Sequence, residues 1–189
     1  MIKRLFIGIP INSDKIFQVG ETWKTNEKLH HGMLKWVNPA NWHVTLIFLG
    51  NTPEKEIPGL QNLIEQSFAD IQAFRTNLRG MGVFPNSNSP KVLWLGIENL
   101  VALLPAQINL VELLKQNDFS LDNKPFNPHL TLARIKNSAS RLAIDALIGQ
   151  YQNFDFGSVA IDHVILYESV STPDGPVYKP LFLKNLKTV

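Results

Sequence analysis

Two short motifs of matching composition stand almost half a chain apart in this sequence. Residues 43–46 read His-Val-Thr-Leu, and residues 129–132 read His-Leu-Thr-Leu. Each motif follows an asparagine within two residues and lies in a segment whose β-branched and aromatic residues predict a strand. Because side chains alternate across a strand, the histidine and the threonine of each motif project from the same face. The residue between them points the other way, into packing.

Two imidazoles and two hydroxyls on a common surface suit an in-line displacement at phosphorus. A neutral imidazole can accept a proton from water while a protonated one donates to the leaving oxygen, since histidine titrates near pH ~6.5. We therefore predict His43 and His129 as the general acid and base. Thr45 and Thr131 are predicted to donate hydrogen bonds to the non-bridging phosphate oxygens. A single His-x-Thr is more often a packed histidine, but two copies at mirrored positions favour the catalytic interpretation.

No metal ion or cofactor is expected. The sequence contains no cysteine, which excludes disulfides, thiolate nucleophiles and cysteine-ligated zinc. Neither motif is accompanied by His-x-x-x-His, Asp-x-Asp or clustered carboxylates. Proton transfer therefore falls to the two imidazoles.

The elements that must position these residues alternate between strands and helices in both halves of the chain. Helices are predicted from Ile16 to Leu29 and over 60–68, 108–114 and 142–148, and strands over 3–11, 41–50, 74–83, 92–97, 126–135, 159–168 and 177–183. This order predicts an α+β fold of two similar lobes, with an approximate two-fold axis that brings the two motifs together across a cleft.

Length and composition limit the class of protein. The chain has 189 residues, 44% of them hydrophobic and 18% charged, with a formal net charge of +2. These values predict one globular domain over residues 1–189, and the small positive charge permits a phosphate-bearing partner. No stretch approaches the roughly 20 apolar residues of a membrane-spanning helix. We expect a cytoplasmic monomer that has no membrane partner.

The sequence resembles the two-histidine (2H) phosphoesterases, and within them the bacterial and archaeal group of 2'-5' RNA ligases and RNA 2',3'-cyclic phosphodiesterases. The resemblance covers nearly the whole chain and runs through segments 4–10, 36–37, 42–50, 82–85, 92–96, 126–134 and 175–178. It implies two lobes, each an antiparallel β-sheet with outer helices, and an active-site cleft between them.

The resemblance also implies a reaction and a division of roles. Family members hydrolyse a terminal 2',3'-cyclic phosphate of RNA to the 2'-phosphate, so the partners would be RNA ends or nucleotides that carry this group. The leaving oxygen is then O3', which implies His43 as its general acid and His129 as the base that activates water. In similar enzymes an arginine at the position of Arg134 contacts the phosphate.

Two further residues are substrate-binding candidates that depend on strand geometry. Strict alternation places Arg134 on the face opposite His129, so contact with phosphate requires a β-bulge between them. Phe48 occupies the matching position of the first motif, where it either forms a wall for a nucleobase or packs into the protein.

The remaining histidines and the nearby tryptophans are expected to be structural. His30 and His31 stand at a predicted helix end and receive no chemistry. His163 has no threonine two positions later, which favours a structural or surface role. Trp36 and Trp42 flank the first motif and could contact a nucleotide, but tryptophan is more often found in the core.

The sequence leaves three other functions open. The same residues could run the reverse reaction as a 2'-5' RNA ligase. A second alternative is a phosphodiesterase of small cyclic nucleotides or of ADP-ribose cyclic phosphate. The third is a module that binds nucleotide or RNA without turnover, although the two intact motifs argue against it.

Overall fold

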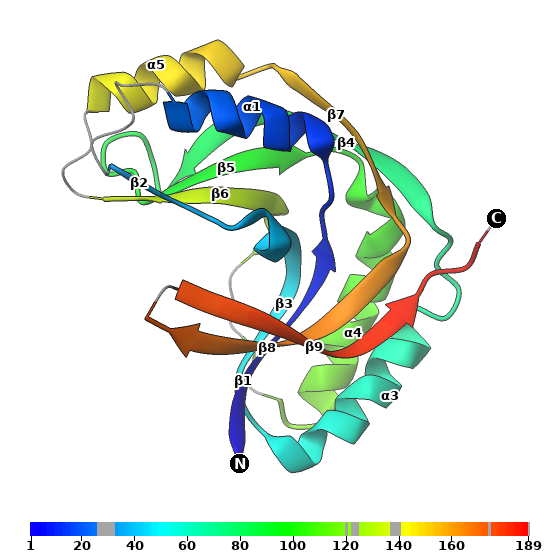
Figure 1. Ribbon diagram of the computed structural model, residues 1–189. Coiled ribbons are helices and arrows are strands. Elements are labelled where there is room, and N and C mark those ends of the chain that lie inside the picture. The colour runs from blue at the N-terminus through cyan, green and yellow to red at the C-terminus, as the bar shows by residue number, and fades with distance from the viewer. Residues whose placement is uncertain (26–32, 120, 122–124, 137–140, 174, 189) are drawn as a thin grey trace.

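The computed structural model describes residues 1–25, 33–119, 121, 125–136, 141–173 and 175–188 (Figure 1). Its helices are α1 (Asp14–Thr25), α3 (Ile57–Ser67), α4 (Leu104–Gln116) and α5 (Arg141–Tyr151), with short 3-10 turns at Pro39–Asn41, Glu54–Glu56 and Leu100–Leu103. Its strands are β1 (Ile2–Pro10), β2 (Leu34–Trp36), β3 (His43–Pro53), β4 (Phe74–Phe84), β5 (Val92–Ile97), β6 (His129–Ile135), β7 (Asp155–Ile161), β8 (His163–Thr172) and β9 (Gly175–Asn185).

The strands form one strongly curled sheet that is symmetric about its centre. Its order is β7-β4-β5-β6-β3-β1-β8-β9, with β2 paired to the side of β6, and all of these pairings are antiparallel. The first lobe comprises β1, β3, β8 and β9, and the second comprises β2 and β4 to β7. The two motif strands, β3 and β6, occupy matching central positions, so the predicted α+β fold with two similar lobes is confirmed.

The repeat of the motif suggests that each half of the sequence forms one lobe, but the lobes do not coincide with the two halves. Helix α1 follows β1 but packs against β7, whereas α4 follows β5 and the 3-10 turn but packs against α3 and β3 (Figure 1). The C-terminal strands β8 and β9 lie in the first lobe beside β1. Each lobe is therefore built from distant parts of the chain, because local hydrophobic patterns specify an element and not its neighbours in the sheet.

Several element boundaries differ from the sequence predictions. The strand predicted over 159–168 is two strands separated at Asp162, and β2 was not predicted. Strand β3 continues to Pro53, three residues beyond its predicted end, because Leu5 to Ile2 of β1 pair with residues 50–53. Strand β6 starts at His129, three residues later than predicted. The end of the first predicted helix, with His30 and His31, lies outside the described residues.

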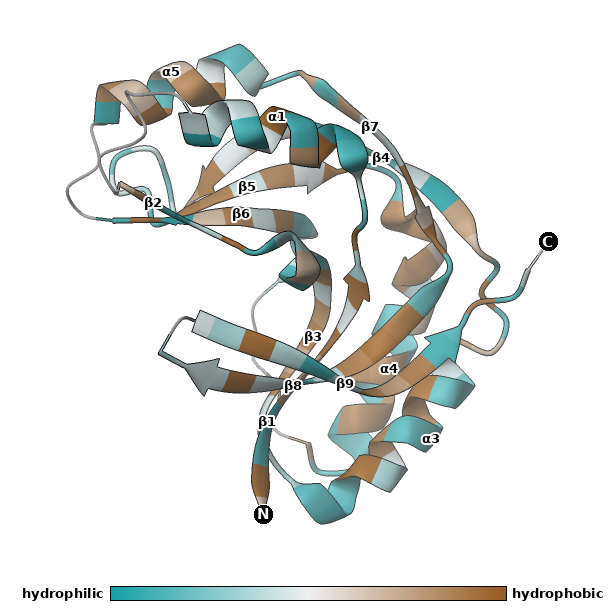
Figure 2. Cartoon of the chain, viewed as in Figure 1, coloured by the Kyte–Doolittle hydropathy of each residue, from teal (hydrophilic) through white to brown (hydrophobic). Residues whose placement is uncertain are grey.

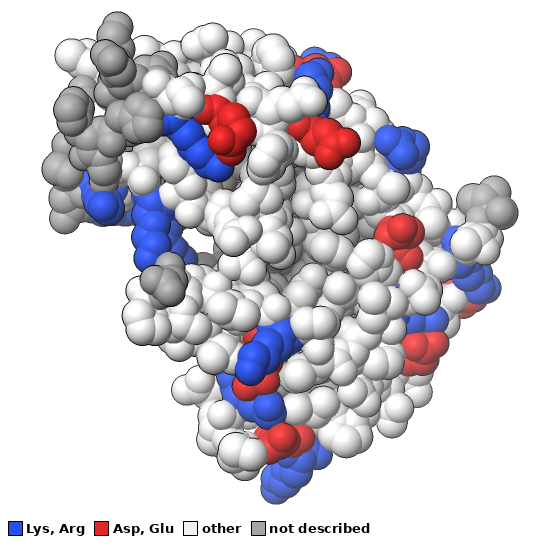
Figure 3. Space-filling model, viewed as in Figure 1, with Lys and Arg blue, Asp and Glu red and all other residues white. Residues whose placement is uncertain are grey.

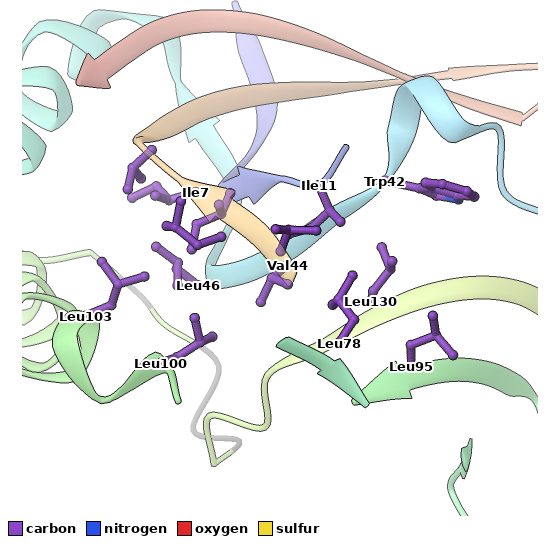
Figure 4. Close-up of a cluster of buried hydrophobic side chains, with 14 of the residues drawn as sticks. Ile7, Ile11, Trp42, Val44, Leu46, Leu78, Leu95, Leu100, Leu103 and Leu130 are labelled. Carbon is purple, nitrogen blue, oxygen red and sulfur yellow. The ribbon is translucent and has the colours of Figure 1, made fainter. Parts of the chain in front are cut away.

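The core lies between the sheet and the helices and is shared by both lobes. Figure 4 shows Ile7 and Leu46 of the first lobe and Leu78 and Leu95 of the second in one cluster of buried side chains. The helices carry hydrophilic and hydrophobic residues on different faces, as expected for elements that cover a sheet on one side only (Figure 2). Among the described residues, no helix has the length and apolar character needed to cross a membrane.

Candidate active site

The two motifs meet where the lobes join. Val44 of β3 and Leu130 of β6 are antiparallel partners, and both side chains are 0% exposed (Figure 4). They are the residues between the histidine and the threonine of each motif, so the prediction that they point into packing is confirmed. The flanking histidine and threonine side chains project from the opposite face, which is partly exposed.

The antiparallel register at this junction fixes how the four side chains are arranged. Because Val44 faces Leu130, the chain directions place His43 on the same side of the junction as Thr131, and Thr45 on the same side as His129. The two histidines are then diagonal neighbours, which in a regular sheet lie about 7–8 Å apart. A phosphate between the two rings would have an imidazole on either side and a threonine hydroxyl beside each ring.

Both imidazoles are held in the same way. Nδ1 of His43 lies 2.7 Å from the carbonyl oxygen of Asn41, and Nδ1 of His129 lies 2.7 Å from the carbonyl oxygen of Asn127. Because a carbonyl only accepts hydrogen bonds, each Nδ1 carries the hydrogen and donates it. Each ring therefore keeps Nε2 available for proton exchange with a substrate.

A matching β-bulge in each strand extends the site. In β3 the pairing with β1 skips Leu46, and in β6 the pairing with β5 skips Leu132. After each bulge the alternation of buried and exposed residues reverses, so that Phe48 and Arg134 are exposed on the side of the histidines. The bulge that the sequence required for Arg134 is therefore present. Phe48 is 58% exposed, so packing does not account for most of its side chain.

Aromatic rings surround both histidines, and they do so unequally. The ring of His43 has Phe6 at 4.8 Å, Tyr178 at 5.0 Å and Tyr167 at 6.4 Å between centroids. Phe6 stacks on Tyr167, and the edge of Tyr178 meets Phe6, so the three rings form one group. This group limits the rotation of the His43 ring and excludes water from one side of it.

The ring of His129 lies against a smaller group. Phe84 meets it edge-on at 4.8 Å and Trp94 lies at 6.5 Å, while these two rings stack on each other at 5.1 Å. Sequence reasoning missed the rings around both histidines, since they come from strands that only the tertiary fold brings together.

The surroundings of His43 change its titration. Burial lowers its pKa below the ordinary value, the hydrogen bond to the carbonyl of Asn41 acts in the opposite direction, and the charge of His129 lowers it further. The influence of one histidine on the other is a sign of their proximity. Burial also raises the pKa of Tyr167 to about 12, so its hydroxyl stays neutral at physiological pH.

Two arginines bring positive charge to the same region. Burial raises the pKa of Tyr178, and the charges of Arg134 and Arg4 partly oppose that rise. Arg134 comes from the second lobe, whereas Arg4 and Tyr178 come from the first. A guanidinium at this place suits an anionic phosphate, because it remains charged at any working pH.

Close backbone packing beside His43 depends on a glycine. Gly8 of β1 pairs with Thr45, and a Cβ at this position would lie 3.0 Å from the carbonyl oxygen of Val44 and 3.5 Å from Cδ2 of His43. A side chain at position 8 would therefore press on the carbonyl of Val44, in the strand that carries the first motif.

The other sequence candidates lie apart from the site. Nδ1 of His163 contacts the carboxylate of Asp162 at 2.5 Å, which agrees with the surface role predicted for it. Trp42 is 8% exposed, and Trp36 stacks on Trp23 at 6.0 Å, so both tryptophans pack in or against the core. Within the described ranges, no three histidine, aspartate or glutamate side chains are grouped as metal ligands would be.

Comparisons with known proteins agree with this architecture. The family model described as the 2'-5' RNA ligase superfamily matches residues 18–172. An RNA 2',3'-cyclic phosphodiesterase of Methanothermobacter thermautotrophicus is 31% identical, with 93% of this chain and 94% of that protein covered. One from Aquifex aeolicus is 35% identical, with 94% of each covered.

Solved structures show the same fold. TT0787 of Thermus thermophilus has a TM-score of 0.75 and 31% identity, with 97% of each chain covered. LigT of Escherichia coli, crystallised with 3'-AMP, has a TM-score of 0.77 and 23% identity, with 98% of this chain and 99% of that one covered. Fold and site together define a two-histidine phosphoesterase, and the chain belongs to the 2'-5' RNA ligase superfamily.

Removal of either threonine hydroxyl is expected to slow the reaction without abolishing it. Thr45→Val and Thr131→Val keep the side-chain shape but delete the hydrogen bond that each hydroxyl is predicted to donate to a charged phosphate oxygen, and such a loss corresponds to about 10- to 100-fold in kcat/KM. Steady-state kinetics measures the loss, and Thr45→Ser and Thr131→Ser are the controls, because they retain the hydroxyl. Valine variants with wild-type kcat/KM would remove the threonines from the reaction.

Proposed function

We propose that this protein is an RNA 2',3'-cyclic phosphodiesterase that hydrolyses a terminal 2',3'-cyclic phosphate to a 2'-phosphate. The observation that carries the proposal is the matched pair of histidines on β3 and β6, each with Nδ1 fixed by a carbonyl and Nε2 available. Relatives at 31–35% identity over most of the chain bear the name of this activity.

In the proposed reaction His129 takes a proton from water as the water oxygen attacks phosphorus. The bond from phosphorus to O3' breaks, and protonated His43 gives its proton to O3', so the product carries a 2'-phosphate and a free 3'-hydroxyl. Thr45, Thr131 and Arg134 stabilise the charge on the phosphate oxygens. Both proton-transfer roles are filled by imidazoles, and the reaction requires no metal ion or cofactor.

The environment of His43 suits the role of general acid. A lowered pKa makes its cation a stronger proton donor, although it also reduces the protonated fraction in the free enzyme. The negative charge of a bound phosphodiester raises the pKa again, so substrate binding itself promotes protonation of His43. The donor is thus charged when the substrate is present.

Exposed basic side chains beside the site favour an RNA chain over a mononucleotide. Lys35 of β2 is the antiparallel partner of Arg134, so both lie on the same face, and Lys136 follows two residues later. Figure 3 shows Lys and Arg side chains and no visible acidic ones beside the ends of β2 and β6. Among the described residues, no carboxylate lies within ion-pair distance of Arg4, Lys35, Arg134 or Lys136. Such cations attract the phosphates that precede the cyclic end.

We further propose that the protein acts as a monomeric single domain over residues 1–189 in the cytoplasm. Both histidines come from one chain, so the site needs no second subunit. The absence of cysteine from the sequence is compatible with a reducing compartment. The 2'-5' RNA ligase reaction is the second candidate, since it would use the same groups in the reverse direction and the family model carries that description.

The test is incubation of an oligonucleotide that ends in a 2',3'-cyclic phosphate, in the presence of EDTA, followed by identification of the product isomer. We expect a 2'-phosphate at an undiminished rate. Loss of activity in EDTA that Mg²⁺ or Mn²⁺ restores would contradict the two-histidine mechanism, and a 3'-phosphate product would contradict the assigned leaving group. A 2',3'-cyclic mononucleotide tested in parallel distinguishes an RNA enzyme from one that acts on small cyclic nucleotides.

A further inference from the structure

We propose that Asn41 is a positioning residue that couples the end of the β8–β9 hairpin to His43. An asparagine precedes both motifs, and the reaction described above uses only the backbone carbonyl of each. The side chain of Asn41 makes a contact of its own, which links His43 to a part of the chain 135 residues away. The catalytic consequence rests on the proposed function, but the contact and its effect on the His43 ring do not.

Asn41 has two contacts that lead in different directions. Its carbonyl oxygen accepts the hydrogen bond from Nδ1 of His43 at 2.7 Å, and its side-chain Nδ2 donates to the carbonyl oxygen of Pro176 at 2.9 Å. The backbone of Asn41 is itself fixed by the 3-10 turn, where its amide donates to the carbonyl oxygen of Asn38 at 2.7 Å. The next residue, Trp42, is buried. A displacement of Asn41 would therefore be transmitted to the imidazole.

The hairpin needs this tether because its end extends beyond the rest of the sheet. Strand β1 pairs with β8 only from Ile165 to Glu168, whereas β8 and β9 continue to pair with each other up to Thr172 and Gly175 (Figure 1). Within the described part of the chain, the last part of the hairpin thus has no sheet neighbour on the β1 side. The hydrogen bond from Asn41 to Pro176 fixes this extension to the 3-10 turn that directly precedes the strand of the first motif.

The tethered segment carries one of the rings that enclose His43. Tyr178 lies two residues after Pro176, and its ring meets the His43 ring nearly perpendicularly at 5.0 Å. Asn41 therefore acts on His43 twice, directly through its carbonyl and indirectly through the strand that places Tyr178. If the hairpin moves away, the ring gains freedom and loses part of its burial, which is the largest cause of its lowered pKa.

The second motif offers a matched control. The carbonyl oxygen of Asn127 accepts from Nδ1 of His129 with the same distance and sequence separation, but the side chain of Asn127 is exposed. Asn41→Ala and Asn127→Ala each leave the backbone carbonyl in place and remove only the amide side chain. A difference between these variants therefore measures the side-chain contact.

The experiment follows the titration of each histidine by NMR and the amide hydrogen exchange of residues 169–172 in wild type and both variants. In Asn41→Ala we expect the pKa of His43 to rise toward its ordinary value and hairpin exchange to accelerate, with neither change in Asn127→Ala. Among the described residues, the titratable or charged groups that contact or influence His43 are His129, Tyr167 and Tyr178, and Arg4 and Arg134 act in turn on Tyr178; both substitutions leave all of these residues unchanged.

Kinetics on the cyclic-phosphate oligonucleotide adds the catalytic consequence. We expect Asn41→Ala to lower kcat by about tenfold with little change in KM, as for a misplaced catalytic group. An Asn41→Ala protein whose His43 titration and hairpin exchange match the wild type would overturn the proposal, as would equal effects of the two alanine variants.

If Asn41→Ala does not fold, Asn41→Ser serves instead, because its side chain is too short to reach Pro176. If the proposed function is wrong, the wild type will not turn over the cyclic-phosphate oligonucleotide. The NMR comparison does not depend on turnover and would still test the role of Asn41.

Discussion

Replacement of His43 or of His129 by alanine is expected to lower kcat by at least about a hundredfold, the usual scale for the loss of a general acid or base. In the proposed reaction each histidine fills a role that none of the neighbouring groups in the described part of the chain can assume. The rings around His43 are phenylalanine and tyrosine, and burial keeps the hydroxyl of Tyr167 neutral, with a pKa of about 12. A group with so high a pKa is a much weaker proton donor than an imidazolium, so the hydroxyl does not substitute for the imidazole.

Both variants should retain the fold, because the two histidines lie outside the core. The residues that join the lobes are Val44 and Leu130, which both substitutions leave intact. His163→Ala is the control, since the imidazole of this histidine contacts the carboxylate of Asp162 and takes no part in the two motifs. Circular dichroism verifies the fold, and single-turnover kinetics measures the chemical step. Near-normal turnover in either variant would exclude that histidine from the reaction.

The rate should depend on pH as a bell, with about a tenfold change per pH unit on each outer limb. One histidine must be neutral to accept a proton and the other charged to donate one, so activity is lost at both extremes. The imidazoles influence each other, and the two limbs therefore report ionisations of the pair. A flat profile from about pH 5 to 9, with chemistry rate-limiting, would contradict acid-base catalysis by two histidines.

The structure indicates how the pKa of the proposed general acid is shifted. His43 is proposed to act when protonated, so its deprotonation removes activity as the pH rises, and burial lowers the pKa of that step in the free enzyme. The profile of kcat reports the enzyme-substrate complex, in which the phosphate charge raises the pKa of His43. The descending limb should therefore appear at higher pH in kcat than in kcat/KM. The pH profile of the residual activity should lack the descending limb in His43→Ala and the ascending limb in His129→Ala. The opposite result would mean that the roles of the two histidines are exchanged.

The sequence by itself predicted the candidate catalytic residues and determined most of the local structure. Alternation along a strand is a local property, and it was enough to place His43 with Thr45 and His129 with Thr131, with a buried residue between each pair. The break in alternation before Arg134 was also predictable, because its proposed contact requires a β-bulge, which the structure contains. The sequence did not specify where that bulge lies.

Only the tertiary structure decided which strands became neighbours. The pairing of Val44 with Leu130, the exchange of α1 and α4 between the lobes and the position of β8 and β9 beside β1 join segments that are far apart in the chain. A hydrophobic pattern predicts that one face of a helix or strand is buried, but it does not predict which other element covers that face. The rings around His43 and the bond from Asn41 to Pro176 depend on that choice of partners, and therefore became visible only in the folded protein.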